Sequence, residues 1–77
     1  MGMTKRHRAL RAFGKHVREI RRKKHFTQEG LAGKAGLDLT YISALDRGCR
    51  NPTLLSIILI AKALGMSVSQ LTRGIGA

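Results

Sequence analysis

Hydrophobic residues recur along this chain at intervals of three and four, the spacing that places side chains on one face of an α-helix. The first such run predicts a helix that begins at residue 9, after a flexible basic arm over residues 1–8. Its apolar face consists of Leu10, Phe13, Val17 and Ile20. The opposite face carries arginines and lysines, and we expect most of it to be solvated.

Two short helices separated by a glycine are predicted in the middle of the chain. The first begins after Thr27, whose hydroxyl can cap it, and ends at Gly36. The second begins after the capping residue Asp38 and ends at Gly48. The inward-facing side chains of the pair are Leu31, Ala32, Ala35, Ile42 and Leu45. Because small residues such as Ala32 allow a close crossing, we expect a helix-turn-helix.

The last third of the chain predicts two more helices. The fourth runs from its cap Thr53 to Leu64, and a fifth begins at Ser67. Ser67 and Gln70 have the S-x-x-Q spacing of a capping box. Residues 74–77 are expected to form a frayed tail, and the β-branched residues all lie in helical patterns. The expected fold is therefore all-α, with five helices.

Length and charge narrow the function. Seventy-seven residues provide one domain, over residues 9–73, and no room for a separate effector-binding or catalytic module. The 15 lysines and arginines against 4 acids give a formal net charge of +11, which points to a polyanionic partner. Nucleic acid is the first candidate. A basic membrane-surface helix is disfavoured, because the chain has no Trp and its two Phe lie in different segments.

The inventory of reactive residues argues against an enzyme. His7, His16 and His25 are scattered, and no pattern of metal ligands, paired carboxylates or catalytic nucleophile is present, so we expect no cofactor and no metal. The single Cys49 excludes an internal disulfide and fits a reducing compartment. No secretory signal or membrane span is recognisable. A cytoplasmic protein associated with the bacterial nucleoid is expected, with Cys49 as an inert thiol rather than a redox switch.

Several short motifs occur in the order and spacing of one known family. They are Phe13-Gly14, Thr27-Gln28, Leu31-Ala32, Tyr41-Ile42-Ser43, Leu45-Asp46-Arg47-Gly48, Asn51-Pro52-Thr53-Leu54 and Ala61-Lys62-Ala63-Leu64-Gly65. Over roughly Phe13 to Leu71 the chain resembles the lambda-repressor/Cro-like helix-turn-helix family, also called XRE. This resemblance implies a five-helix DNA-binding transcriptional regulator of prokaryotic or phage origin.

The resemblance also implies which residues read the DNA bases. In the family, the N-terminal residues of the second helix of the motif, the recognition helix, face the base edges in the major groove. The corresponding positions here are Leu39, Thr40, Ser43 and Ala44. Because this set lacks Arg, Asn and Gln, we expect methyl contacts with thymine and single hydroxyl hydrogen bonds. The alternative for Leu39 is a buried first residue of the helix.

A second set of residues is assigned by the resemblance to the DNA phosphates. These residues are Gln28, Arg47, Arg50 and Asn51. For Gln28 the physical argument is independent of the family, because free N–H groups at a helix N-terminus attract anions. The alternatives are that Arg47 and Arg50 are ordinary surface cations, and that Asn51 is a turn residue before Pro52.

A structural ion pair is also implied. Asp46 matches a family acid that pairs with an arginine of the first helix, and Arg21 occupies the matching position. Such a pair would tie the recognition helix to the rest of the domain. Gly30 and Gly33 depart from the family pattern and are expected to weaken the second helix by about 1–2 kcal/mol relative to alanine.

The apolar residues of the last two helices exceed the needs of one small core. Those expected to form an exposed interface are Leu55, Ile58, Leu59, Met66 and Leu71. The favoured hypothesis is a homodimeric repressor or autoregulator on a pseudo-palindromic operator, with no evident small-molecule effector. The alternatives are an antitoxin or interaction module that binds a toxin or another regulator through the fourth helix, and an RNA- or ribosome-associated basic protein.

Overall fold

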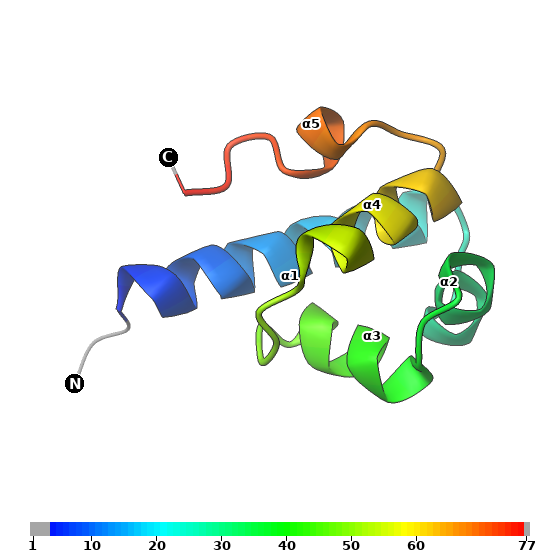
Figure 1. Ribbon diagram of the computed structural model, residues 1–77, viewed down its shortest axis with the longest axis horizontal. Helices are drawn as coiled ribbons and strands as arrows, with labels where there is room; N and C mark the ends of the chain where they lie inside the picture. Colours follow the sequence, from blue (N-terminus) through cyan, green and yellow to red (C-terminus); the bar gives the residue numbers. More distant parts are fainter. Residues whose placement is uncertain (1–3, 77) are drawn as a thin grey trace.

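Five α-helices and no strand make up the part of the chain that the computed structural model describes, residues 4–76 (Figure 1). They are α1 (Lys5–Lys23), α2 (Gln28–Ala35), α3 (Leu39–Asp46), α4 (Leu54–Ala63) and α5 (Val68–Leu71). The predicted all-α fold is confirmed. α2 and α3 pack on each other, α1 packs on α3, and α4 lies between α2 and α5.

The predicted helix caps are present. Thr27, Asp38 and Thr53 each accept a backbone N–H from the first turn of the helix that follows, at 2.9, 2.9 and 3.1 Å. Ser67 and Gln70 form both hydrogen bonds of the capping box. These side chains satisfy N–H groups that have no partner inside the helix, so the start of each helix is fixed by a local interaction.

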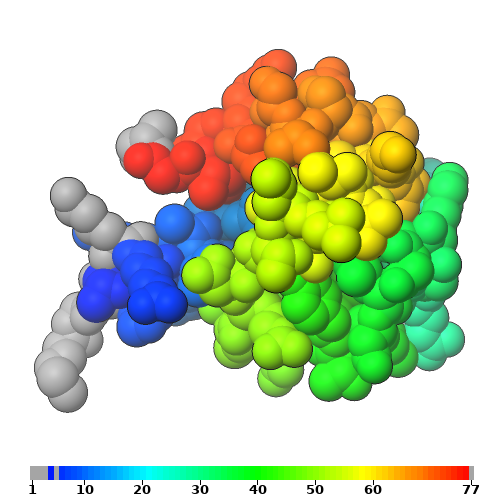
Figure 2. All heavy atoms as spheres, viewed as in Figure 1, coloured from blue at the N-terminus to red at the C-terminus, as the bar shows by residue number. Residues whose placement is uncertain are grey.

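The first helix begins earlier than the hydrophobic pattern predicted. Thr4 accepts a hydrogen bond from the His7 backbone N–H at 3.2 Å and caps a helix that starts at Lys5. Residues 5–8 of the expected flexible arm are therefore helical, whereas residues 1–3 of that arm lie outside the described residues. The prediction failed because a local cap can start a helix before its apolar face begins. The beginning of α1 extends beyond the body formed by the other helices (Figure 2).

The C-terminal tail also differs from the expectation. Ile75 packs partly against the core, and its backbone N–H donates to the Thr72 carbonyl at 3.0 Å. The expected fraying of residues 74–77 is thus wrong for residues 74–76, and residue 77 lies outside the described residues.

The core consists of side chains from all five helices. Its buried members are Phe13, Val17, Leu31, Ala32, Ala35, Ile42, Leu45, Ile60, Ala61, Ala63, Leu64 and Leu71. Leu71 was expected at an interface, but it is fully buried and anchors the single turn of α5. Leu59 and Met66 were also expected there, yet both pack partly against the core. Leu71 therefore belongs to the core of the domain, whereas Leu59 and Met66 keep part of their surface exposed.

Two glycines allow α1 to approach the end of α3 very closely. A Cβ atom on Gly14 would overlap the backbone carbonyl of Leu45 and would lie 3.0 Å from that of Asp46. A Cβ atom on Gly48, which has a φ of 73°, would lie 2.8 Å from the Cα of Arg11. The C-terminal end of α3 is therefore held directly against the α1 backbone.

The same substitution at two helical glycines should have opposite effects. Gly33→Ala should raise the free energy of unfolding by about 0.5–1 kcal/mol, because the new methyl group meets open space and alanine favours the helix. Gly14→Ala should lower it by about 1–3 kcal/mol, because the methyl group forces α1 away from α3. Urea denaturation of both variants measures the two changes. A Gly14→Ala variant as stable as the wild type would contradict this close approach.

Candidate nucleic-acid interface

The outer face of α3 has the exposure that groove recognition requires. Leu39 is 41% exposed and Thr40 is exposed, whereas Ser43 and Ala44 are half-buried. Leu39 is therefore not a core residue, which removes the alternative raised for it. The opposite face of the helix is anchored in the core. α3 lies at one edge of the molecule, opposite α5 (Figure 1).

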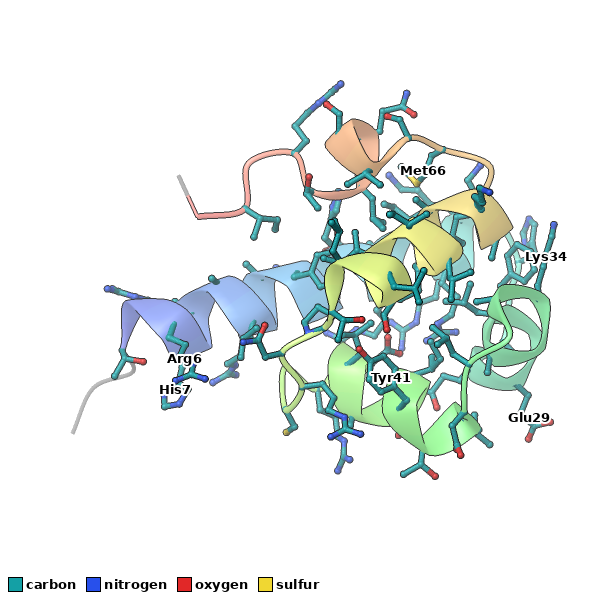
Figure 3. All side chains as sticks on the ribbon, in the orientation of Figure 1. Arg6, His7, Glu29, Lys34, Tyr41 and Met66 are labelled. Atoms are coloured by element: carbon teal, nitrogen blue, oxygen red, sulfur yellow. The ribbon has the colours of Figure 1, made fainter. Side chains whose placement is uncertain are left out.

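A shallow hollow lies where the N-termini of α2 and α3 meet. Its lining residues are Arg21, Thr27, Gln28, Glu29 and Leu39, and its volume is about 420 Å³. The first N–H groups of α2 and the positive end of its dipole make this corner favourable for an anion. Glu29 projects outward from α2 (Figure 3). The hollow is thus a suitable place for a phosphate next to the exposed start of α3.

Cationic side chains stand at the other end of α3. Arg47 donates from Nε to the Ser43 carbonyl at 3.3 Å, and the Arg50 guanidinium lies 5.0 Å from the centre of the Tyr41 ring. A guanidinium on an aromatic face keeps its N–H donors available. Arg47, Arg50 and Asn51 are all exposed. The exposed face of α3 therefore lies between two regions that favour phosphate.

A buried polar network joins α3 to both preceding helices. Asp46 Oδ2 accepts from Arg21 Nη2 at 3.0 Å and from Gln28 Nε2 at 2.9 Å. Arg21 also donates from Nη1 to the carbonyl of Phe26 at 2.9 Å. Arg21 is 7% exposed and Asp46 is 4% exposed. The expected Arg21–Asp46 pair is thus present, and it links α1, the α1–α2 loop, α2 and α3.

Two features of this region go beyond what the sequence pattern predicted. That pattern paired Asp46 with Arg21 and indicated that Gln28 braces the recognition helix, but it did not foresee that Gln28 does so by donating to the same carboxylate oxygen. It also did not foresee that Tyr41 supports Arg50. Both contacts depend on how α3 lies against its neighbours, for which the spacing of residues along the chain contains no signal.

An apolar surface, here termed the α4 patch, consists of Leu54, Leu55 and Ile58. Leu54 is 68% exposed, Leu55 is 65% exposed and Ile58 is half-buried. Leu55 and Ile58 belong to the set expected at an interface, and Leu54 is a further exposed leucine that was not in that set. α4 is apolar on most of its faces, so periodicity alone did not separate its inner side from its outer side.

Two other kinds of site are not found in the part of the chain that the structure describes. No group of three or more His, Cys, Asp or Glu side chains is placed to hold a metal ion. None of the helices is long and apolar enough to cross a lipid bilayer.

Comparison with known sequences points to one family. The sequence model described as Helix-turn-helix matches residues 17–71. Control protein C.BamHI of Bacillus amyloliquefaciens is 47% identical over 60 residues, which cover 77% of this chain and 74% of that protein. The HTH-type transcriptional regulator y4dJ of Sinorhizobium fredii is 41% identical over 54 residues, which cover 70% of each chain.

Comparison with solved structures points to the same family. The crystal structure of the restriction-modification controller protein C.AhdI from Aeromonas hydrophila superposes with a TM-score of 0.79 and 40% sequence identity. The match covers 80% of this chain and 94% of that chain. The arrangement of α2 and α3 is therefore shared with a protein of similar sequence.

Breaking the buried pair should be strongly destabilising. Asp46→Leu or Arg21→Met alone should lower the free energy of unfolding by about 3–5 kcal/mol, because each leaves the other charge buried without its partner. The double variant should recover most of the loss. Lys15→Gln, which breaks the exposed pair with Glu19, is the control and should change stability by less than about 1 kcal/mol. If the losses of the two single variants added up in the double variant, the two buried charges would not depend on each other, and this prediction would be wrong.

Proposed function

Because the chain belongs to the XRE-type helix-turn-helix family of DNA-binding transcriptional regulators, which are not enzymes, we propose that it binds a pseudo-palindromic operator as a homodimer. It acts there as a repressor or autoregulator in the cytoplasm of a prokaryote, on nucleoid DNA. The observation that carries the proposal is the exposed face of α3 between two phosphate-favouring regions. The similarity to the control proteins C.BamHI and C.AhdI supports a regulatory role.

Base recognition is assigned to the exposed side of α3. Leu39 and the methyl group of Thr40 contact thymine methyls, while the hydroxyls of Thr40 and Ser43 make single hydrogen bonds to base edges. Ala44 is small enough to let the helix approach the bases. None of these side chains can make two hydrogen bonds to one base. The discrimination between the right and the wrong base pair is therefore at the low end of about 1–3 kcal/mol per base pair.

Backbone contacts set the position of α3 in the groove. The N-terminus of α2 with Gln28 binds a phosphate on one side, and Arg47, Arg50 and Asn51 bind phosphates on the other. Because the amide nitrogen of Gln28 donates to Asp46, it orients the α2 terminus, whose backbone N–H groups face the phosphate. These contacts supply affinity and register but little sequence preference.

A second copy of the chain is the proposed occupant of the α4 patch. One recognition helix reads too few base pairs for useful specificity, whereas two related by a two-fold axis read half-sites about 34–36 Å apart. The same patch on both subunits can form such a symmetric contact. The net charge of +11 on each subunit opposes association, so apolar contact and bound DNA must offset the repulsion.

The α4 patch also supports a second candidate function. Two leucines exposed by 68% and 65% on adjacent positions of one helix form a surface that a different protein can cover. In this alternative the chain is an antitoxin or interaction module, and its partner is a toxin or another regulator.

The assignment of base and phosphate contacts can be tested with two alanine variants. Thr40→Ala should weaken binding to the preferred site by about 1–3 kcal/mol and leave random DNA unaffected, because it removes a contact with a base. Arg50→Ala should weaken binding to both DNAs alike, because it removes a phosphate contact. Affinities on a selected operator and on random DNA measure the difference. Identical behaviour of the two variants would show that α3 does not enter the groove in this orientation.

The homodimer can be tested with two leucines that are both exposed. Leu55→Glu should give a folded monomer with greatly weakened operator binding and persistent weak non-specific binding, because it places a charge in the apolar contact. Leu39→Glu is the matched control, which should weaken DNA binding without changing the oligomeric state. Sedimentation measures mass with and without operator DNA. A wild type that stays monomeric at high micromolar concentration and on DNA would refute the dimer and favour a different protein at the α4 patch.

A further inference from the structure

A cleft lies between α1 and the C-terminal end of α3. It is distinct from the hollow at the N-termini of α2 and α3 and lies away from the residues assigned to base recognition. Its lining residues are Arg11, Ala12, Lys15, Arg18, Asp46 and Arg47, and its volume is about 260 Å³. Four of these six side chains are cationic and one is acidic. We term this site the α1–α3 cleft.

The cations of the α1–α3 cleft outnumber the acids nearby. Asp46 is already bound by Arg21 and Gln28 through Oδ2. Glu19 lies 4.0 Å from Lys15, but the two side chains are 53% and 69% exposed, and a pair of this kind is weak in water. The other two acids, Glu29 and Asp38, belong to the N-terminal ends of α2 and α3. The cleft therefore carries excess positive charge.

The cations are also held on a rigid frame. Arg11, Lys15 and Arg18 follow each other at intervals of four and three residues, which places them on one face of α1. Arg47 faces them from the end of α3. The α1 backbone packs closely on the end of α3 at Gly14 and Gly48, and the buried Arg21–Asp46 pair joins the two helices. The backbone positions that carry these cations are thus set by the fold before any ligand arrives.

We propose that the α1–α3 cleft binds a backbone phosphate of the DNA strand that passes the end of α3. Arg47 belongs both to the cleft and to the phosphate-favouring end of α3, so a strand held there is continuous with the cleft. Arg6 and His7, one to two turns earlier on α1, project toward the side on which α3 lies (Figure 3). α1 is thereby a second DNA-contacting element, and it lengthens the footprint of each subunit.

The length of the basic face suits a strand of DNA. Arg11 and Arg18 are seven residues apart, which corresponds to about 10 Å along a helix. Each strand of double-stranded DNA carries one negative charge per about 3.4 Å of the helix axis, so more than one phosphate is available over this span. The inference rests on the DNA binding of the family. It requires neither the homodimer nor the assignment of base contacts on α3.

The test compares two double variants that each remove two positive charges. Lys15→Gln with Arg18→Gln removes cations from the cleft, while Lys62→Gln with Arg73→Gln removes exposed cations from α4 and the tail as a control. The affinity of each protein for a random-sequence duplex is measured from 50 to 200 mM salt. The cleft variant should show a salt dependence shallower by about 0.9 in the slope of log K against log salt for each phosphate that it no longer neutralises. The control should keep the wild-type slope.

Equal slopes for the cleft and control variants would overturn the proposal, because only the overall charge would then matter. A titration of the wild type with inorganic pyrophosphate, followed by amide NMR shifts, tests a small anion as the ligand. Pyrophosphate binding at Lys15 and Arg18 together with an unchanged DNA slope in the cleft variant would also overturn it.

Two controls keep the outcomes separable. Thermal unfolding checks that the variants are folded, and Lys15→Gln alone, at an exposed position, should give part of the same change in slope. A wild type that does not bind DNA would overturn the DNA-binding function itself together with this inference. Failure of the cleft alone would leave wild-type DNA binding intact.

Discussion

The carboxylate of Asp46 is the group on which the placement of the first three helices depends. It is buried at the end of α3 and receives one donor from α1 and one from α2 through a single oxygen, Oδ2. A buried charge is tolerated only when its partners are held in good geometry, so any shift of α1 or α2 against α3 weakens the network. Gly14 makes this geometry reachable, because a side chain there would push α1 away from Asp46.

The network also offsets a weakness inside the DNA-binding motif. α2 has eight residues and contains both Gly30 and Gly33, which lower its intrinsic preference for the helix. Its N-terminus is nevertheless fixed from two sides, by the Thr27 cap and by the bond from Gln28 to Asp46. The N-terminal end of α2 is thus fixed to the C-terminal end of α3. Contacts with other helices therefore fix the N-terminus of a helix whose own sequence favours the helical state only weakly.

The charges of the protein are distributed so that its cationic surfaces stay available. Three of the acids have structural tasks at helix ends: Asp46 closes the buried network, Asp38 caps α3 and Glu29 lies in the first turn of α2. The positive charge therefore remains concentrated along α1 and at the end of α3, where a polyanion can meet both.

The sequence alone determined the features that depend on a few neighbouring residues. The caps at Thr27, Asp38, Thr53 and Ser67 involve contacts within one turn, so residue type and spacing were sufficient to predict them. The family motifs added the Arg21–Asp46 pair. Only the tertiary structure decided that Leu71 is buried while Leu54 is exposed, because nearly every face of α4 is apolar and α5 is one turn long. It alone also brought Gln28 to Asp46 and Arg47 to the basic face of α1, since those contacts join helices whose relative positions are set by packing.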